Sequence, residues 1–266
     1  MNTNEMIAAL RDQVRVARDE FDFLIACHEA WKPAAYDKAL HQRLSHSYAG
    51  NTFLVVRSVL RREMLMALTR LWGEDSKQTL GMRFVAKCLS RPAIIQQLAD
   101  ECSAQWGRIH DPDLGEIPES EREGLVESMN RSEVAFGLEM AEALRKRATQ
   151  AVALIAKYDQ GGTCHAVLKS LRNLRNERLA HRQVTPTPIE VRGEDASDKE
   201  IEAFYQDMSE LIKILLSVVL RTSYDTADTA GVFQFHAKFF WASVRGERTE
   251  GHPSYRPQRP EGLCSP

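Results

Sequence analysis

Apolar residues recur at three- and four-residue spacing along most of the chain, which is the period of an amphipathic α-helix. From Leu10 to Ile25 the apolar side chains fall on one helical face, and no segment longer than a few residues alternates as a β-strand does. The pattern therefore predicts an all-α protein. We expect helices over about residues 4–31, 34–47, 51–72, 80–89, 91–106, 119–158, 163–180, 197–224 and 227–244.

Proline and glycine set the expected boundaries in the first half of the chain. Lys32-Pro33 is expected to end the first helix, because the residue before a proline disfavours helical backbone. Gly50 is expected to separate the second helix from the third, and the Gly161-Gly162 pair to stop the long helix that begins near residue 119.

In the second half, hydroxyl and carboxylate side chains supply the expected helix starts. Thr163 can cap a helix that runs to about Ala180, and Ser197 or Asp198 can cap the next. Residues 184–195 contain two prolines and a glycine and are expected to form a loop with a short extended piece.

The length of 266 residues, of which 43% are hydrophobic, suffices for one large domain or two small ones. The best internal linker is the Pro- and Gly-containing stretch at residues 107–118, and it is short. We therefore expect one helical domain over residues 1–247. Residues 248–266, rich in Pro, Gly, Arg and Ser, are expected to be a disordered tail.

Charge and cysteine content narrow the class of protein. The net charge of −2 excludes a globally basic nucleic-acid binder, so contact with an acidic polymer would need a local basic patch. The five cysteines are odd in number and form no CxxC, which favours reduced thiols in the cytoplasm. No signal peptide is expected, and the most apolar stretch, residues 212–220, is too short to span a membrane. No phosphate loop or metal-ligand motif occurs, so we expect neither a cofactor nor a metal.

The segment that argues for chemistry is the predicted helix over residues 163–180. Its apolar face centres on Leu171, with Val167 and Leu168 one turn earlier. At about 100° per residue, three arginines continue this face toward the C-terminal end, and two further cations flank it. The arginines of the face are Arg175, Arg178 and Arg182, and the flanking cations are Lys169 and Arg172.

Two interpretations of this arginine stripe compete. In one, the arginines bind helix-terminal carbonyls and pair with nearby acids. In the other, Arg175 and its neighbours hold phosphates while His181, whose side chain has an ordinary pKa of about 6.5, transfers protons. Cleaving an RNA backbone without metal needs a base, an acid and a cation for the phosphorane charge. Asn176 could hydrogen-bond the histidine or the phosphate.

Helix geometry sets a condition on the second interpretation. Arg175 and His181 are six residues apart, which in an ideal helix is about 9 Å of rise and about 120° of rotation. They converge only if the helix ends near His181 and the chain turns back. A symmetric dimer is another route, because two copies of one shallow site can form a single cleft.

The arginine, polar residue and histidine of this segment resemble the motif of the HEPN superfamily of helical-bundle domains. The letters LRNERLAHR at residues 174–182 are similar to the form found in AbiU-type abortive-infection members. The similarity extends to FYQDM at residues 204–208, to the helix over 51–72 with its ALTRLW end and to FFW at 239–241. It would cover about residues 4–244.

The resemblance implies a HEPN-like helical bundle with additional helices and a metal-independent endoribonuclease acting in toxin–antitoxin or antiphage defence. It places the active site on His181 and Arg175, supports it with Asn176, and implies a homodimer cleft, an RNA substrate and a cognate antitoxin. Arg172, Arg178 and Arg182 would bind RNA phosphates; these three come from the helix faces rather than from the family.

Two alternatives remain open from the sequence. The chain can be a non-catalytic helical module that binds a protein or a nucleotide through the arginine stripe, with Asn176 and His181 structural. It can also be a plain RNA-binding domain, whose affinity would fall steeply with salt. Both differ from the nuclease in predicting no RNA cleavage.

Overall fold

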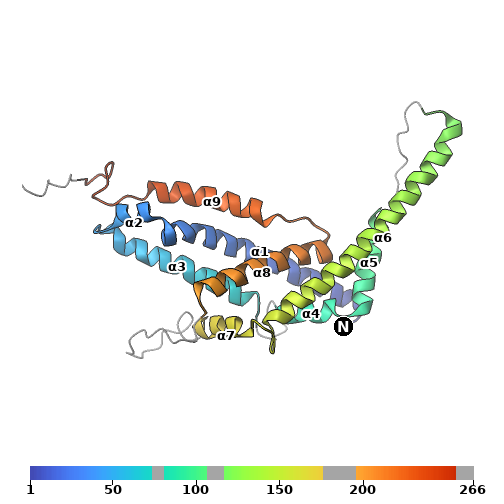
Figure 1. The fold of residues 1–266 in the computed structure, drawn as a ribbon, viewed down its shortest axis with the longest axis horizontal. Helices are drawn as coiled ribbons and strands as arrows, with labels where there is room; N and C mark the ends of the chain where they lie inside the picture. The colour runs from blue at the N-terminus through green and yellow to red at the C-terminus, as the bar shows by residue number, and fades with distance from the viewer. Residues whose placement is uncertain (74–80, 107–116, 176–195, 256–266) are drawn as a thin grey trace, which may run out of the picture. The chain divides into compact units, whose positions relative to one another are not determined.

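The computed structural model describes residues 1–73, 81–106, 117–175 and 196–255, and within them the chain is all-α (Figure 1). The all-α prediction is thereby confirmed: the described ranges contain no β-strand, only an isolated bridge between Trp72 and Gly81. The helices are α1 (Thr3–Tyr36), α2 (Lys38–Leu44), α3 (Ala49–Arg70), α4 (Met82–Leu89), α5 (Pro92–Trp106), α6 (Glu119–Tyr158), α7 (His165–Leu174), α8 (Asp198–Leu215), the π-helix η2 (Leu216–Leu220) and α9 (Thr226–Ser243).

The chain forms two compact units. Unit 1 comprises the described parts of Met1–Arg18, Leu71–Arg172 and residues 196–224, and therefore holds the start of α1, helices α4 to α6, most of α7, α8 and η2. Unit 2 comprises Asp19–Arg70, residues 173–175 and residues 225–255, with the rest of α1 and helices α2, α3 and α9. The prediction of one domain over residues 1–247 followed by a disordered tail stays a prediction.

Unit 1 is built around the long helix α6, which packs on α4, α5 and α8. The residues that α6 buries recur at alternating three- and four-residue steps, and several of them are small, which lets neighbouring helices approach closely. They are Gly137, Ala141, Leu144, Ala148, Ala151, Ile155 and Tyr158.

Helices α5 and α6 approach each other closely at Gly137. A Cβ atom there would lie 3.0 Å from the carbonyl oxygen of Ser103 on α5. That separation is tighter than ordinary van der Waals contact, so the glycine sets how closely α5 and α6 can pack.

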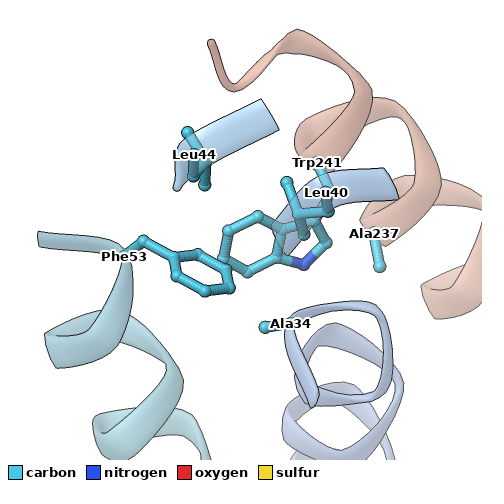
Figure 2. Close-up of a cluster of buried hydrophobic side chains, with 6 residues drawn as sticks. All are labelled: Ala34, Leu40, Leu44, Phe53, Ala237 and Trp241. Carbon is cyan, nitrogen blue, oxygen red and sulfur yellow. The ribbon is translucent and has the colours of Figure 1, made fainter. Parts of the chain in front are cut away.

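Unit 2 has its own core, in which the Trp241 indole of α9 sits at the centre of a small apolar cluster (Figure 2). The indole N–H donates a 2.8 Å hydrogen bond to the carbonyl of Ala30, and the ring of Phe53 meets it edge-on at 5.6 Å. Burying an aromatic side chain while its polar atom is paired gives both apolar contact and orientation. The cluster is completed by Ala34, Leu40, Leu44 and Ala237.

The predicted end of the first helix at Pro33 is wrong, because α1 continues through that proline to Tyr36. Proline removes one backbone hydrogen bond from a helix interior, which normally favours a break. Here Ala34 is fully buried in the core of unit 2, and the chain turns instead at Asp37, whose carboxylate accepts from the N–H groups that open α2.

The predicted break at Gly50 is also wrong, since α3 begins at Ala49 and includes that glycine. The hydroxyl of Ser47 accepts a 3.0 Å bond from Ala49 N–H and donates one of 2.6 Å to the Glu247 carboxylate. Glu247 also accepts from Tyr48 N–H. A side chain about 200 residues away thus satisfies the helix start, which local sequence could not indicate.

Candidate functional site

The helix that leads into the candidate motif is α7. Its predicted apolar face is confirmed, because Val167, Leu168 and Leu171 are all buried. Burial of a leucine such as Leu171 contributes roughly 1.5–3 kcal/mol. The face therefore fixes the rotation of α7 about its own axis.

The turn before α7 is set by Gly161 and Gly162, which end α6 as predicted. Gly161 has φ +85°, and a Cβ at Gly162 would lie 2.2 Å from the carbonyl oxygen of Ala156, so this turn requires glycine. Thr163 does not cap α7 as predicted: its hydroxyl lies 3.9 Å from the Cys164 sulfur, and the helix begins at His165. The tight turn uses Cys164 N–H for a 2.9 Å bond to Lys157 O, which moves the helix start along the chain.

Polar contacts hold α7 at both ends of its buried face. At the start, His165 Nδ1 lies 3.3 Å from the carbonyl oxygen of Tyr158 and donates to it in the tautomer protonated there. At the other end, the Arg172 guanidinium donates a 2.6 Å hydrogen bond to the carbonyl oxygen of Trp72. These contacts fix the position of α7 along its axis.

The chain also returns to α7 after the motif region. The backbone N–H of Ala196 donates a 2.7 Å bond to the Ser170 hydroxyl. Ser197 then caps α8 through a capping box with Glu200, which confirms one of the two predicted caps. Arg175 and Ala196 flank the stretch that is not described. Arg175 directly follows α7, and Ala196 contacts it.

An aromatic cluster lies in unit 1 around the two residues whose carbonyls anchor α7. Tyr158 and Phe204 have ring centroids 4.5 Å apart, and Trp72 is 5.9 Å from Tyr158 and 6.3 Å from Phe204. The Trp72 indole N–H donates to the sulfur of Met208 at 3.3 Å. Large rings packed in this way support the α7 anchors on a rigid base.

A charged group is built into the same cluster. The Tyr158 hydroxyl donates a 2.5 Å bond to the Asp207 carboxylate, which also pairs with the Lys157 ammonium. Burial, and then the hydrogen bond to the Asp207 carboxylate, raise the pKa of Tyr158 far above its usual value of 10.0. The bond to Asp207 likewise raises the pKa of Lys157. This group ties the end of α6 to α8 with Tyr158 held neutral.

Two of the six predicted site residues lie within the described part of the chain. Arg172 lies in the last turn of α7 and Arg175 is the first residue after it; both side chains are half-buried. Asn176, Arg178, His181 and Arg182 lie outside the described residues, as do residues 176–180 of the predicted helix. The roles predicted for these six residues therefore stay predictions.

Sequence reasoning missed both the Arg172–Trp72 contact and the Tyr158–Asp207–Lys157 group. The partners are 100 and 49 residues apart, respectively, and no local pattern connects them. The only signals were that Tyr158 ends a predicted helix and that Leu171 centres a predicted apolar face, and the second indicates burial without naming the partner.

The described part of the chain holds neither a cluster of metal-ligand side chains nor a membrane-spanning helix. There, no three or more His, Cys, Asp or Glu residues gather in a way that could bind a metal ion. None of the described helices combines the length and the apolar character needed to cross a membrane.

The model of the AbiU2 family, HEPN_AbiU2, matches residues 4–240, a span that runs from α1 into α9 and includes the motif at residues 175–181. An all-α chain with this motif after a docked helix is of the HEPN class, and the chain belongs to the AbiU2 family. The resemblance drawn from the LRNERLAHR segment is thus confirmed. No curated protein and no solved structure shows a significant match.

Proposed function

We propose that this chain is a metal-independent endoribonuclease of abortive-infection defence. His181 acts as the acid and base, Arg175 stabilises the charge of the phosphorane, and Asn176 orients the histidine or the phosphate. Arg172, Arg178 and Arg182 bind neighbouring RNA phosphates. Membership in the AbiU2 family and the residue types of the motif support these roles.

The observation that carries the proposal is the fixed position of the helix before the motif. A buried apolar face and the bonds of His165 and Arg172 hold α7, and Arg175 follows it directly. Catalytic groups act best when rigid elements hold them within a fraction of an ångström, because the arrangement is then ready before substrate binds. A helix pinned at both ends is a suitable base for a catalytic arginine.

The end of α7 also bears on whether Arg175 and His181 can converge on one site. A continuous ideal helix would hold Arg175 and His181 about 120° apart. Within the described residues the α-helical backbone ends at Leu174 and Arg175 has π-helical backbone, which turns differently from an α-helix, so the separation of an ideal α-helix does not apply unchanged to the motif. A homodimer in which two motifs share one cleft, restrained in the cell by a cognate antitoxin, completes the proposal.

Single-residue variants test the catalytic roles. We expect His181→Ala and Arg175→Ala each to lower RNA cleavage in EDTA by about 10²–10⁴-fold, the usual contribution of a positioned acid–base group. His236→Ala on α9 and Arg131→Ala on α6 remove the same residue types from exposed helix faces and should cleave normally. Wild-type cleavage by His181→Ala would overturn the catalytic role, and activity that EDTA abolishes would overturn metal independence.

Mixing variants tests the shared cleft. If two protomers contribute to one site, His181→Ala and Arg175→Ala proteins that are unfolded and refolded together should regain part of the activity that each lacks alone. Light scattering should give the mass of a dimer. A monomer that cleaves RNA at the wild-type rate would contradict the dimer, and a wild type that never cleaves RNA would favour the non-catalytic module.

A further inference from the structure

Helices α5, α6 and the continuous α8–η2 helix of unit 1 line a cavity of 410 Å³ that is open to solvent on one side. Each helix lines it with one face, since the lining residues follow helical spacing. On α6 these are Met140, Leu144 and Arg147, and on α8–η2 they include Lys213 and Ser217. The volume lies in the range of sites for small organic ligands, about 300–1,000 Å³.

The lining carries more positive than negative charge. Arg147, Lys213 and Arg221 reach it from α6, from α8 and from the residue after η2, respectively. Glu210 is the one acid among the described residues that line the cavity. Cations brought to one small cavity from separate elements are typical of a site for an anionic group.

Two of these cations are held in place by neighbours. The Arg147 guanidinium donates a 2.7 Å bond to the hydroxyl of Ser217, one turn after Lys213. The Arg221 guanidinium donates a 2.9 Å bond to the carbonyl oxygen of Glu101 on α5, whose carboxylate is 3.9 Å away. A guanidinium has five N–H donors, so each bond orients the group and leaves further donors in its fork geometry.

The backbone that forms the cavity rim is irregular. The predicted helix to Tyr224 is wrong at this end, because α8 passes into the π-helix η2, which ends at Leu220. The next residue, Arg221, has φ and ψ of 56° and 35°. Left-handed backbone is strained for an arginine and persists only where contacts enforce it, and here Glu101 holds the side chain. Short π-helices and such strained residues are both frequent at functional sites.

The rest of the cavity wall suits the organic part of a ligand. Met140, Leu144 and Ile214 provide an apolar side, and Tyr224 provides an aromatic ring. Aromatic and apolar walls with a few placed charged groups are the usual composition of small-molecule sites. The hydroxyls of the rim are those of Ser217, Thr222 and Ser223.

We propose that this cavity binds a small phosphate-bearing organic molecule of about nucleotide size. Arg147, Lys213 and Arg221 contact its phosphates, and Met140, Leu144 and Tyr224 contact its organic part. The cavity lies in unit 1 and shares no residue with the motif at 175–181, so it is a separate site that does not depend on the nuclease proposal.

Calorimetric titration of the full chain with ADP, inorganic phosphate and adenosine tests the site. We expect ADP to bind more tightly than phosphate, and adenosine to bind weakly. Arg147→Gln and Lys213→Gln should each weaken ADP binding by about tenfold or more, as loss of a charge-assisted hydrogen bond does. Lys146→Gln removes the same charge one residue away, on an exposed position outside the cavity lining, and should bind as wild type.

Several outcomes would overturn the site. Absence of ADP binding at millimolar concentration, equal loss in Lys146→Gln, or adenosine binding as tight as ADP would each do so. Binding of phosphate alone would overturn the nucleotide-sized ligand. Circular dichroism and the unliganded melting temperature should match between variants, which separates lost binding from lost fold. Titration of His181→Ala should match wild type, so failure of the nuclease proposal leaves this result unchanged.

Discussion

The guanidinium of Arg172 donates a 2.6 Å hydrogen bond to the carbonyl oxygen of Trp72, a residue 100 positions earlier in the chain. Arg172 stands three residues before Arg175, in the last turn of α7. The bond therefore joins the helix end that precedes the motif to the aromatic cluster of Trp72, Tyr158 and Phe204. The same bond occupies one N–H donor of Arg172, a residue that was predicted from the sequence to bind RNA phosphates.

Loss of this anchor should destabilise the protein. Arg172→Ala is expected to lower the free energy of unfolding of unit 1 by about 1–2 kcal/mol, because it leaves a carbonyl without its charged donor. Thermal melting followed by circular dichroism measures the change. Lys169→Ala, exposed one turn earlier on α7, is the matched control and should melt as wild type. Equal melting of both variants would show that the bond does not anchor the helix.

Alanine should have opposite effects at two glycines of α6. Nothing lies within 4 Å of a Cβ at Gly124, so Gly124→Ala should stabilise the helix by about 0.5–1 kcal/mol. A Cβ at Gly137 would lie 3.0 Å from the Ser103 carbonyl, so Gly137→Ala should destabilise by about 1–3 kcal/mol through overpacking. Melting temperatures compare the two. A rise of equal size in both would contradict the close packing of α5 on α6.

Tyr158 should make stability fall at alkaline pH. Its pKa is raised in the folded state, so its contribution is complete below the unfolded value of 10.0 and is lost as the pH rises above it. The stability advantage of wild type over Tyr158→Phe should therefore shrink above pH 10, by up to about 1.4 kcal/mol per pH unit. Urea unfolding across that range measures it.

Two further variants complete this test. Tyr48→Phe, whose ring is 90% exposed, should keep the wild-type dependence on pH. Asp207→Asn removes the carboxylate that Tyr158 and Lys157 share. It should reduce the alkaline loss of stability more than Tyr158→Phe does, because the same carboxylate also raises the pKa of Lys157. A wild-type advantage over Tyr158→Phe that stays constant from pH 9 upward would be incompatible with a raised pKa of Tyr158.

Thiol reactivity should separate the described cysteines. Burial, and then the nearby Glu63 carboxylate, raise the pKa of Cys27 to about 11, and burial raises the pKa of Cys88. Since the thiolate is the reactive form, both should resist alkylation by iodoacetamide in the native protein. Cys164, half-buried at the start of α7, should react first, as followed by peptide mass spectrometry. Labelling in urea should remove the difference, whereas native labelling of Cys27 at the Cys164 rate would contradict its burial.

The arginine stripe should make RNA binding depend on salt. In the His181→Ala background, Arg178→Gln and Arg182→Gln should each lower the slope of log affinity against log salt by about 0.7, the value for one phosphate contact on a single strand. Fluorescence anisotropy with a labelled RNA measures the slope. Lys199→Gln, on the exposed start of α8, is the control. An RNA affinity that hardly changes with salt would show that these arginines do not contact RNA phosphates.

The sequence by itself determined the elements whose causes are local. The apolar periodicity predicted the helices. The Gly161-Gly162 pair predicted the end of α6, and Ser197, which forms a capping box with Glu200, predicted the start of α8. The buried face of α7 followed from the spacing of its leucines and valine. The LRNERLAHR letters also pointed to the family, because a short motif and its context are carried by neighbouring residues.

Only the tertiary structure decided features that join distant residues. Helix α1 continues through Pro33 into Ala34, which is buried in the core of unit 2, and the Glu247 carboxylate binds the start of α3 from about 200 residues away. Arg172 donates a hydrogen bond to Trp72, and Tyr158 donates one to Asp207. Arg221 adopts left-handed backbone and donates a hydrogen bond to Glu101. Local propensities amount to about 1 kcal/mol per residue or less for most side chains, so burial and long-range hydrogen bonds of similar or larger size overrule them.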